Sequence, residues 1–365
     1  MIFTIAEGDA GETRWGLIWL RQAAGDDKGQ PALPRSVDDV RHEVYGSIIV
    51  REDRTDGTGT AADVGARRDP EFIRAHAPKL ALLFERYHRT SVDGLEHVPA
   101  GPALAVGNHN GGLMAPDMFA LMVAWWRRFG VDAPAYGLMH DLPFHLPIAR
   151  DLMPRLGAVP AHPANALALL GRGAKVLVYP GGDIDAFRPW SQRHRIVFGQ
   201  RCGFIRVALR ARVPIVPIVS AGAHESFRIL TDGRDLVRRL GLKRLFHRLE
   251  VFPITLCLPW GITFGPAYYL PVPVRMHLRA LPPVSWPSLP PEAADDEATV
   301  WRCREQVRQT MQDALDEMTR EGRYGRRRLF EPDVSRATAA PAPPPRRPSR
   351  GAPRSAGSVF PAPPG

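Results

Sequence analysis

His109 is the residue of this sequence whose setting best suits proton transfer. It closely follows an apolar run, 103–106, and precedes a loop that contains Gly111 and Gly112. The run predicts a buried strand, and the glycines would let a substrate approach the backbone. A neutral imidazole at a strand end can take the proton of an attacking hydroxyl group. A carboxylate on its far nitrogen would fix the tautomer, and the loop leads to Asp117.

The segments around His109 predict an α/β protein. Apolar runs typical of buried strands occur at 103–106, 176–179 and 215–219. Helices are expected at 118–126, 163–170, 204–210 and from about 297 to 321. We therefore predict a single domain with a mostly buried central sheet flanked by helices, and with function at the strand ends.

Composition divides the chain into three parts. Residues 1–69 are interpreted as a variable, partly flexible leader, because 25–70 is polar and shows no sustained hydrophobic period. Residues 70–328 carry the expected strands and helices and form the functional domain. Residues 329–365 are rich in proline and arginine and hold almost no large apolar side chains. Burial there cannot offset the entropy of folding, so we predict a disordered tail.

Charge and cysteine content limit the classes of partner and compartment. The net charge of +10 favours phosphates, nucleic acid or an anionic membrane surface. No basic platform with interleaved aromatic residues is visible, so we expect no nucleic-acid binding. Cys202, Cys257 and Cys303 are far apart, which argues against a cysteine zinc site or a disulfide scaffold and fits a reducing compartment. We expect neither a signal peptide nor a spanning helix.

A metal site is not expected either. His140, Asp141 and His145 lie close together, but their spacing does not match the His-x-x-x-His pattern of a metal-binding helix. A metal-dependent hydrolase that uses His109, His140 and Asp141 stays open as an alternative. The sequence contains no Gly-x-Ser-x-Gly elbow and no phosphate-loop or dinucleotide fingerprint. Serine hydrolases, nucleotide hydrolases and dehydrogenases are therefore disfavoured.

Four blocks in the same order resemble the lysophospholipid and glycerolipid acyltransferase family, and the resemblance covers most of Leu80–Gly222. The first block leads into Asn108-His109, which is similar to the family's catalytic Asn-His. The other three are Arg155–Pro160, Leu177–Gly182 and Val213–Ile218. Four blocks at the usual separations are hard to obtain by chance.

The resemblance implies transfer of an acyl chain from a thioester, acyl-CoA or acyl-carrier protein, to a hydroxyl group, without an acyl-enzyme and without a cofactor. His109 would be the general base, and Asp117 would orient it. Backbone groups near Gly111 and Gly112, or in the third block, would steady the oxyanion. The substrate-binding residues expected on this basis are Asn108, Gly111, Gly112, Tyr179, Pro180, Gly181 and Gly182.

The sequence departs from the family pattern at three places. The family motif His-x-x-x-x-Asp would put the carboxylate at Met114, so Asp117 is our choice, with Asp141 or no partner as alternatives. Gly181 stands where the family often has Glu, and Ala161-His162 stands where an Arg often holds a phosphate. Paired glycines resemble the diacylglycerol-acyltransferase-like branch. A neutral or unusual hydroxyl acceptor is then at least as plausible as lysophosphatidate.

Arginines that follow the third block are candidates for phosphate binding. We assign Arg188 and Arg201 to the substrate-binding residues, where they would hold the phosphates of coenzyme A or an acidic carrier protein. Arg193 and Arg195 belong to the same group. The alternative is a loop whose arginines are simply solvated.

Two segments favour contact with a membrane surface. Basic and apolar residues interleave from Arg234 to Arg248, and Val251–Leu270 is apolar but broken by prolines. The ordinary alternatives are a helix with its basic face in water and a piece of core. We predict a peripheral enzyme on the inner, cytoplasmic face of the membrane that acylates a glycerolipid or lysophospholipid. A non-catalytic lipid-binding protein of the same fold is the other alternative.

Overall fold

The computed structural model describes residues 63–239 and 251–325, all of which belong to the unit Ala61–Gly365. The tail from 329 onward, most of the expected leader and residues 240–250 of the basic segment lie outside the described residues. The predictions made for them therefore stay predictions.

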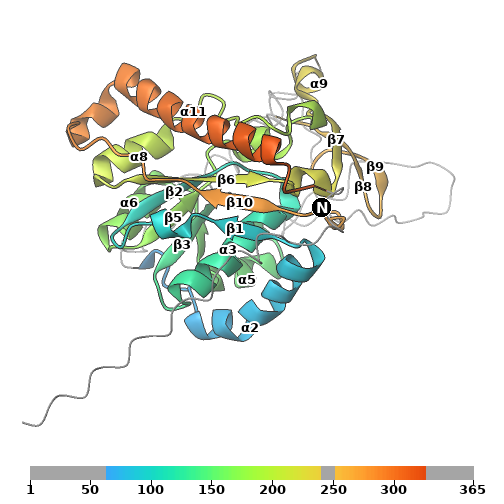
Figure 1. The fold of residues 1–365 in the computed structure, drawn as a ribbon, viewed down its shortest axis with the longest axis horizontal. Helices are drawn as coiled ribbons and strands as arrows, with labels where there is room; N and C mark the ends of the chain where they lie inside the picture. Colours follow the sequence, from blue (N-terminus) through green and yellow to red (C-terminus); the bar gives the residue numbers. More distant parts are fainter. Residues whose placement is uncertain (1–62, 240–250, 326–365) are drawn as a thin grey trace, which may run out of the picture. The chain divides into compact units, whose positions relative to one another are not determined.

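A seven-stranded, mostly parallel sheet forms the centre of the domain (Figure 1). Its five neighbouring parallel strands are, in order, β6 (Ile215–Ala221), β2 (Ala103–Gly107), β5 (Lys175–Val178), β3 (Ala135–Met139) and β4 (Ala158–Pro160). Beyond β6 lie β10 (His277–Ala280), which is antiparallel to β6, and β1 (Ser91–Asp93), which is parallel to β10. The predicted α/β fold is confirmed, and the three predicted strands are present. Because β2, β5 and β6 are parallel neighbours, their carboxyl ends meet at one edge of the sheet.

Helices cover both faces of this sheet because its central strands are apolar on both sides. Ala103 and Ala105 of β2 pack in the same core as α2 (Pro70–Leu82), α3 (Pro116–Phe129) and α5 (Ala149–Arg155). Leu104 and Val106 pack in the opposite core, with α6 (Pro163–Gly171), α8 (Gly203–Ala211) and α11 (Glu297–Glu321). The predicted helix near 297–321 thus has the expected bounds.

The remaining elements of the domain are short. They are α4 (Leu142–His145), α7 (Gly182–Ala186), α9 (Arg234–Arg239), the π-helix η2 (Leu83–Tyr87) and the 3-10 helices η3 (Leu95–His97), η4 (Gly112–Met114), η5 (Trp190–Gln192), η6 (Ala223–Ser226) and η7 (Pro291–Asp295). Among the described helices, none has the length and apolar content needed to span a bilayer.

A second, smaller sheet stands beside the central one, at the right of Figure 1. Its antiparallel strands are β7 (Arg228–Thr231), β8 (Ile254–Cys257) and β9 (Gly261–Phe264). Side chains alternate between the two faces of a strand. Ile229 and Cys257 point to a buried cluster with Phe187, Phe227 and Tyr269, against which Met114 packs. This sheet therefore supports the loop that follows His109.

Candidate active site

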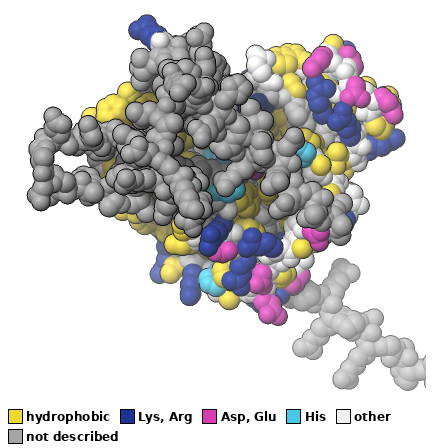
Figure 2. Space-filling model, turned by 180° about the vertical axis from the view of Figure 1, so that it is seen from behind, with side chains coloured by type: hydrophobic (Ala, Val, Ile, Leu, Met, Phe, Trp, Pro, Cys, Tyr) yellow, Lys and Arg dark blue, Asp and Glu magenta, His cyan; other side chains and the backbone are white. Residues whose placement is uncertain are grey.

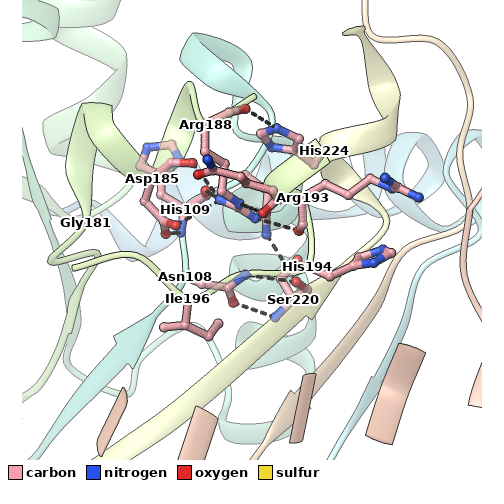
Figure 3. A network of polar contacts seen from close by, with 12 residues as sticks. Asn108, His109, Gly181, Asp185, Arg188, Arg193, His194, Ile196, Ser220 and His224 are labelled. Carbon is pink, nitrogen blue, oxygen red and sulfur yellow. Dashed lines mark hydrogen bonds and ion pairs between the residues drawn. The ribbon is translucent and has the colours of Figure 1, made fainter. Parts of the chain in front are cut away.

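His109 stands just beyond the carboxyl end of β2, in the middle of the central sheet. The residue before it anchors the loop: the Asn108 amide donates to the Ser220 carbonyl at 3.0 Å and its oxygen accepts from the Ser220 N–H at 2.8 Å (Figure 3). Asn108 is completely buried, so these bonds replace those it would make with water. In this structure Asn108 links the end of β2 to β6 and fixes the position of the backbone that carries His109.

The surroundings of the His109 imidazole keep it neutral. Its Nδ1 atom is buried and has no hydrogen-bond partner among the described residues. Its ring lies against Tyr179, with the ring centroids 5.3 Å apart. Burial, with a smaller contribution from the Arg188 charge, lowers the pKa of His109 to about 4. The ring is therefore unprotonated at pH 7, which is the state a general base needs.

Asp117 lies in the first turn of α3 and is buried. Its carboxylate accepts from the Asn110 amide at 3.0 Å and from the Met118 N–H at 2.9 Å. Burial raises its pKa to about 6, although these hydrogen bonds and a contact with Ser220 oppose the rise. Within the described chain, no hydrogen bond joins the Asp117 carboxylate to His109. The carboxylate is bonded instead to Asn110, the residue that follows His109 in the sequence. Their direct pairing stays a prediction.

A buried ion pair, which the sequence analysis did not single out, holds the His109 loop. The Asp185 carboxylate accepts from the backbone N–H of His109 at 2.5 Å. Arg188 donates to the Asp185 carboxylate at 2.9 Å and to the His109 carbonyl at 2.8 Å, and it also bonds the Asn110 side chain. Figure 3 shows Arg188 at the centre of these contacts. The pair thus fixes both the N–H and the carbonyl of His109.

Arg188 is buried against the His109 loop, and its expected contact with a substrate phosphate stays a prediction. Its side chain is 1% exposed, and its guanidinium donates to oxygen atoms of the surrounding residues. Its own carbonyl is bonded to the buried ring of His224 at 2.8 Å. The available signal was an Asp and an Arg three residues apart, shortly after the paired glycines Gly181 and Gly182. That the two residues hold the His109 backbone can be recognised only from their contacts in the structure.

The third block, from Tyr179 to Gly182, lies beside His109 at the end of β5. A Cβ atom at Gly181 would come within 2.3 Å of the Asp185 Cβ and of the Val197 carbonyl oxygen. Arg201 donates to the Gly181 carbonyl at 2.7 Å and to the Asp183 carboxylate at 2.6 Å. Arg201 is only partly buried, so its expected contact with a substrate phosphate stays a prediction.

The loop after His109 adopts backbone conformations that favour glycine. Gly111 and Gly112 have φ values of 75° and 52°. The Tyr269 hydroxyl donates to the Gly111 carbonyl at 2.7 Å, and a Cβ atom at Gly112 would lie 2.9 Å from the Phe227 ring. Residues that flank the small sheet thereby hold the loop in addition to the Asp185–Arg188 pair.

An apolar cavity of about 80 Å³ starts beside Tyr179 and extends between α3, β3 and β5 as far as Lys175. Its lining is almost entirely apolar and includes four methionines, Met118, Met122, Met139 and Met153. Methionine side chains are flexible, so this lining can rearrange around an inserted chain. Tyr179, which lines the cavity, also contacts the His109 ring, whereas His109 itself is not among the lining residues.

The residues considered for a metal site do not form one in the described chain. His140, Asp141 and His145 are exposed. No cluster of three or more His, Cys, Asp or Glu side chains able to hold a metal ion occurs among the described residues.

A histidine with a lowered pKa thus lies just beyond the end of a parallel strand, in contact with Tyr179, which lines an apolar cavity. The family model described as Acyltransferase matches residues 89–221, which include this histidine and the third block. An uncharacterized protein of Mycobacterium tuberculosis is 31% identical over 264 residues, 72% of this chain and 70% of that protein. The chain therefore belongs to the Acyltransferase family, whose model it matches over residues 89–221, and is an acyltransferase.

Two more distant similarities were found. The mouse protein named "DGAT1/2-independent enzyme synthesizing storage lipids" is 27% identical over 148 residues, 40% of this chain and 44% of that protein. The crystal structure of the 1-acyl-sn-glycerophosphate acyltransferase PlsC from Thermotoga maritima covers 76% of this chain and 89% of its own, at 16% identity and a TM-score of 0.40.

Proposed function

We propose that this protein is a membrane-associated O-acyltransferase that moves a fatty acyl group from a thioester to a hydroxyl group of a glycerolipid or lysophospholipid. The observation that carries the proposal is the neutral imidazole of His109 against Tyr179, which lines an apolar cavity. The donor would be acyl-CoA or acyl-carrier protein, and the cavity would hold the start of its acyl chain.

In the proposed reaction, His109 takes the proton of the acceptor hydroxyl as its oxygen attacks the thioester carbonyl carbon. The new C–O bond gives a tetrahedral oxyanion. When this intermediate collapses, the C–S bond breaks, and the thiolate leaves with the proton that the imidazolium returns. The reaction therefore consumes no net proton and needs no acyl-enzyme.

Backbone N–H groups are the proposed donors to the oxyanion. The N–H of Gly182, in the third block, already donates to the Tyr179 carbonyl at 3.1 Å. This bond favours the loop of Gly111 and Gly112 as the source of the donors. Their positive φ values turn the backbone beside His109, where the carbonyl oxygen of the donor would lie.

The test is an acyl-transfer assay with purified protein, radiolabelled acyl-CoA and a panel of lysophospholipids, monoacylglycerol and diacylglycerol. Loss of the general base in His109→Ala should reduce the rate by about 10²–10⁴-fold. His140→Ala replaces an exposed histidine and serves as the matched control, so it should keep the wild-type rate. A wild-type rate that survives His109→Ala would contradict the mechanism. Lipid binding without transfer to any acceptor would favour a non-catalytic lipid-binding protein.

A further inference from the structure

The small sheet presents a bare apolar face on the side opposite the buried cluster. In β8, Thr255 and Cys257 are buried, whereas Leu256 between them is 48% exposed. In β9, Ile262 and Phe264 are 59% and 68% exposed. Alternation along each strand thus separates an inner face that supports the active-site loop from an outer face that is uncovered.

Eight large apolar side chains make up this outer apolar face, and each is between 48% and 68% exposed. They are Leu230, Leu256, Leu258, Trp260, Ile262, Phe264, Tyr268 and Leu270. They adjoin one another, because Leu256 pairs with Ile262 and Leu258 with Leu270. The described residues contain fourteen exposed large apolar side chains, so more than half belong to this one small sheet and its loops. Soluble monomers rarely expose contiguous apolar patches of more than a few hundred Å².

The charge pattern of the sequence that forms and flanks the small sheet fits an anionic surface. No charged residue occurs from Val251 to Val274. The chain that connects β7 to β8 includes Arg234–Arg248, in which six Lys and Arg residues accompany one acidic residue, Asp235. Basic residues near an anionic bilayer are attracted by its negative surface potential. On the molecular face shown in Figure 2, by contrast, basic and acidic side chains are intermixed.

The chemistry of the outer apolar face suits lipid better than water. The Trp260 indole N–H donates to the Tyr268 carbonyl at 2.7 Å, so the ring can enter an apolar phase without losing a hydrogen bond. Trp and Tyr beside aliphatic side chains are typical of surfaces at the membrane interface. A protein partner would require a polar rim, whereas the whole hairpin β8–β9 lacks charged side chains.

The outer apolar face is directly connected to the active site. Tyr269, next to Tyr268, bonds the Gly111 carbonyl, and Met114 packs on the inner cluster of the sheet. Leu113, on the same loop, is 37% exposed. We propose that the outer apolar face of the β7–β8–β9 sheet docks on an anionic lipid bilayer and brings the His109 loop to the membrane surface. This inference rests on the proposed function, because docking would bring the active site to the membrane in which a lipid acceptor lies.

The test is sedimentation of the full chain with vesicles of phosphatidylglycerol and phosphatidylethanolamine, and with vesicles of phosphatidylcholine alone. The triple variant Trp260→Ser, Ile262→Ser, Phe264→Ser should bind the anionic vesicles at least about tenfold more weakly than wild type. Ile148→Ser removes an exposed apolar side chain elsewhere and should bind normally. Brominated acyl chains should quench tryptophan fluorescence in the wild type and less in Trp260→Phe.

Three results would overturn the docking proposal. They are unchanged vesicle binding by a folded triple variant, a wild-type dimer that the triple variant loses, and iodide quenching of tryptophan fluorescence that is, without vesicles, no greater in wild type than in Trp260→Phe. The last two would show that a second copy or another segment of this chain covers the face. His109→Ala should bind vesicles normally, and the triple variant should still acylate monomeric, short-chain substrates. Failure of docking and failure of the proposed function are thereby distinguished.

Discussion

The guanidinium of Arg188 donates to the carboxylate of Asp185 at 2.9 Å, and both side chains are completely buried against the loop that carries His109. Burying two charges costs solvation energy that is recovered only if every donor and acceptor finds a partner. Here two of the other bonds of the pair go to the N–H and the carbonyl of His109, and others go to Asn110 and to nearby carbonyls. The ion pair therefore couples the stability of the fold to the position of the candidate base.

Arg188→Ala should lower the free energy of unfolding by about 3–5 kcal/mol, because it leaves the Asp185 charge buried and unpaired. Urea unfolding measures this change. Arg74→Ala breaks an exposed ion pair with Asp132 and should cost less than about 1 kcal/mol. If Arg188→Ala does not fold, Arg188→Lys keeps the charge but loses the fork of hydrogen bonds, and should reduce kcat at least about tenfold. An Arg188→Ala protein as stable as wild type would contradict the assignment.

Asp117→Asn should reduce kcat by about 10²-fold if this carboxylate organises the base, as we predict. The comparison with Asp141→Asn is decisive, because Asp141 is the alternative partner and is exposed. That variant should keep the wild-type rate in the same acyl-transfer assay. The opposite result, an active Asp117→Asn and an inactive Asp141→Asn, would transfer the role to Asp141.

The rate of acyl transfer should fall in two steps as the pH decreases. Burial raises the pKa of Asp117 to about 6 and lowers that of His109 to about 4. The first step is therefore protonation of the carboxylate near pH 6, and the second is protonation of the base near pH 4. Asp117→Asn should lack the upper step. A single step near the ordinary histidine pKa of about 6.5 would show that the ring is not buried as described.

The lowered pKa of His109 also predicts how the free energy of unfolding depends on pH. Its folded-state pKa is below the unfolded value of about 6.5, so the unfolded chain binds the proton first. We therefore expect His109 to contribute no pH dependence above about pH 6.5 and a loss of stability as the pH falls from there to about 4. Urea unfolding of wild type and His109→Phe across this range should show a steeper acid loss for wild type. Identical slopes would contradict this expectation.

Gly181→Ala should destabilise the protein by about 1–3 kcal/mol and reduce its activity. The added methyl group would meet Asp185 and the Val197 carbonyl at 2.3 Å, which displaces the carboxylate that holds His109. Gly171→Ala is the control, since nothing lies within 4 Å of a Cβ atom there and alanine favours a helix. Thermal unfolding and the acyl-transfer rate measure both effects. Equal behaviour of the two variants would show that position 181 tolerates a side chain.

Gly137→Leu should shift the enzyme toward shorter acyl donors. Gly137 lines the cavity beside Tyr179, and nothing lies within 4 Å of a Cβ atom built there. A leucine side chain would occupy space that the acyl chain is proposed to fill. The ratio of kcat/KM for long and short acyl-CoA donors should fall, while the rate with short donors is retained. An unchanged ratio would place the acyl chain elsewhere.

The fold class could be predicted because its signals are local. Four-residue and five-residue apolar runs indicated β2, β5 and β6, and the periodic apolar positions of 297–321 indicated α11. Each of these patterns depends on which face of a single strand or helix a side chain occupies. The positions of neighbouring residues along the sequence determine that face. The small sheet β7–β8–β9 was not predicted from the sequence. Its strands are short, and no local hydrophobic pattern indicates that β7 and β8 pair across residues 232–253.

The sequence by itself determined that a histidine follows a buried strand, that glycines surround it and that four blocks stand in the order of an acyltransferase. Only the tertiary structure decided that Asn108 bonds Ser220, that Asp185 and Arg188 hold the His109 backbone, and that Tyr269 bonds Gly111. These partners are between 76 and 158 residues apart in the chain. Hydrogen bonds and burial act over a few ångströms in space, so the partner of a buried group depends on packing and not on its neighbours in sequence.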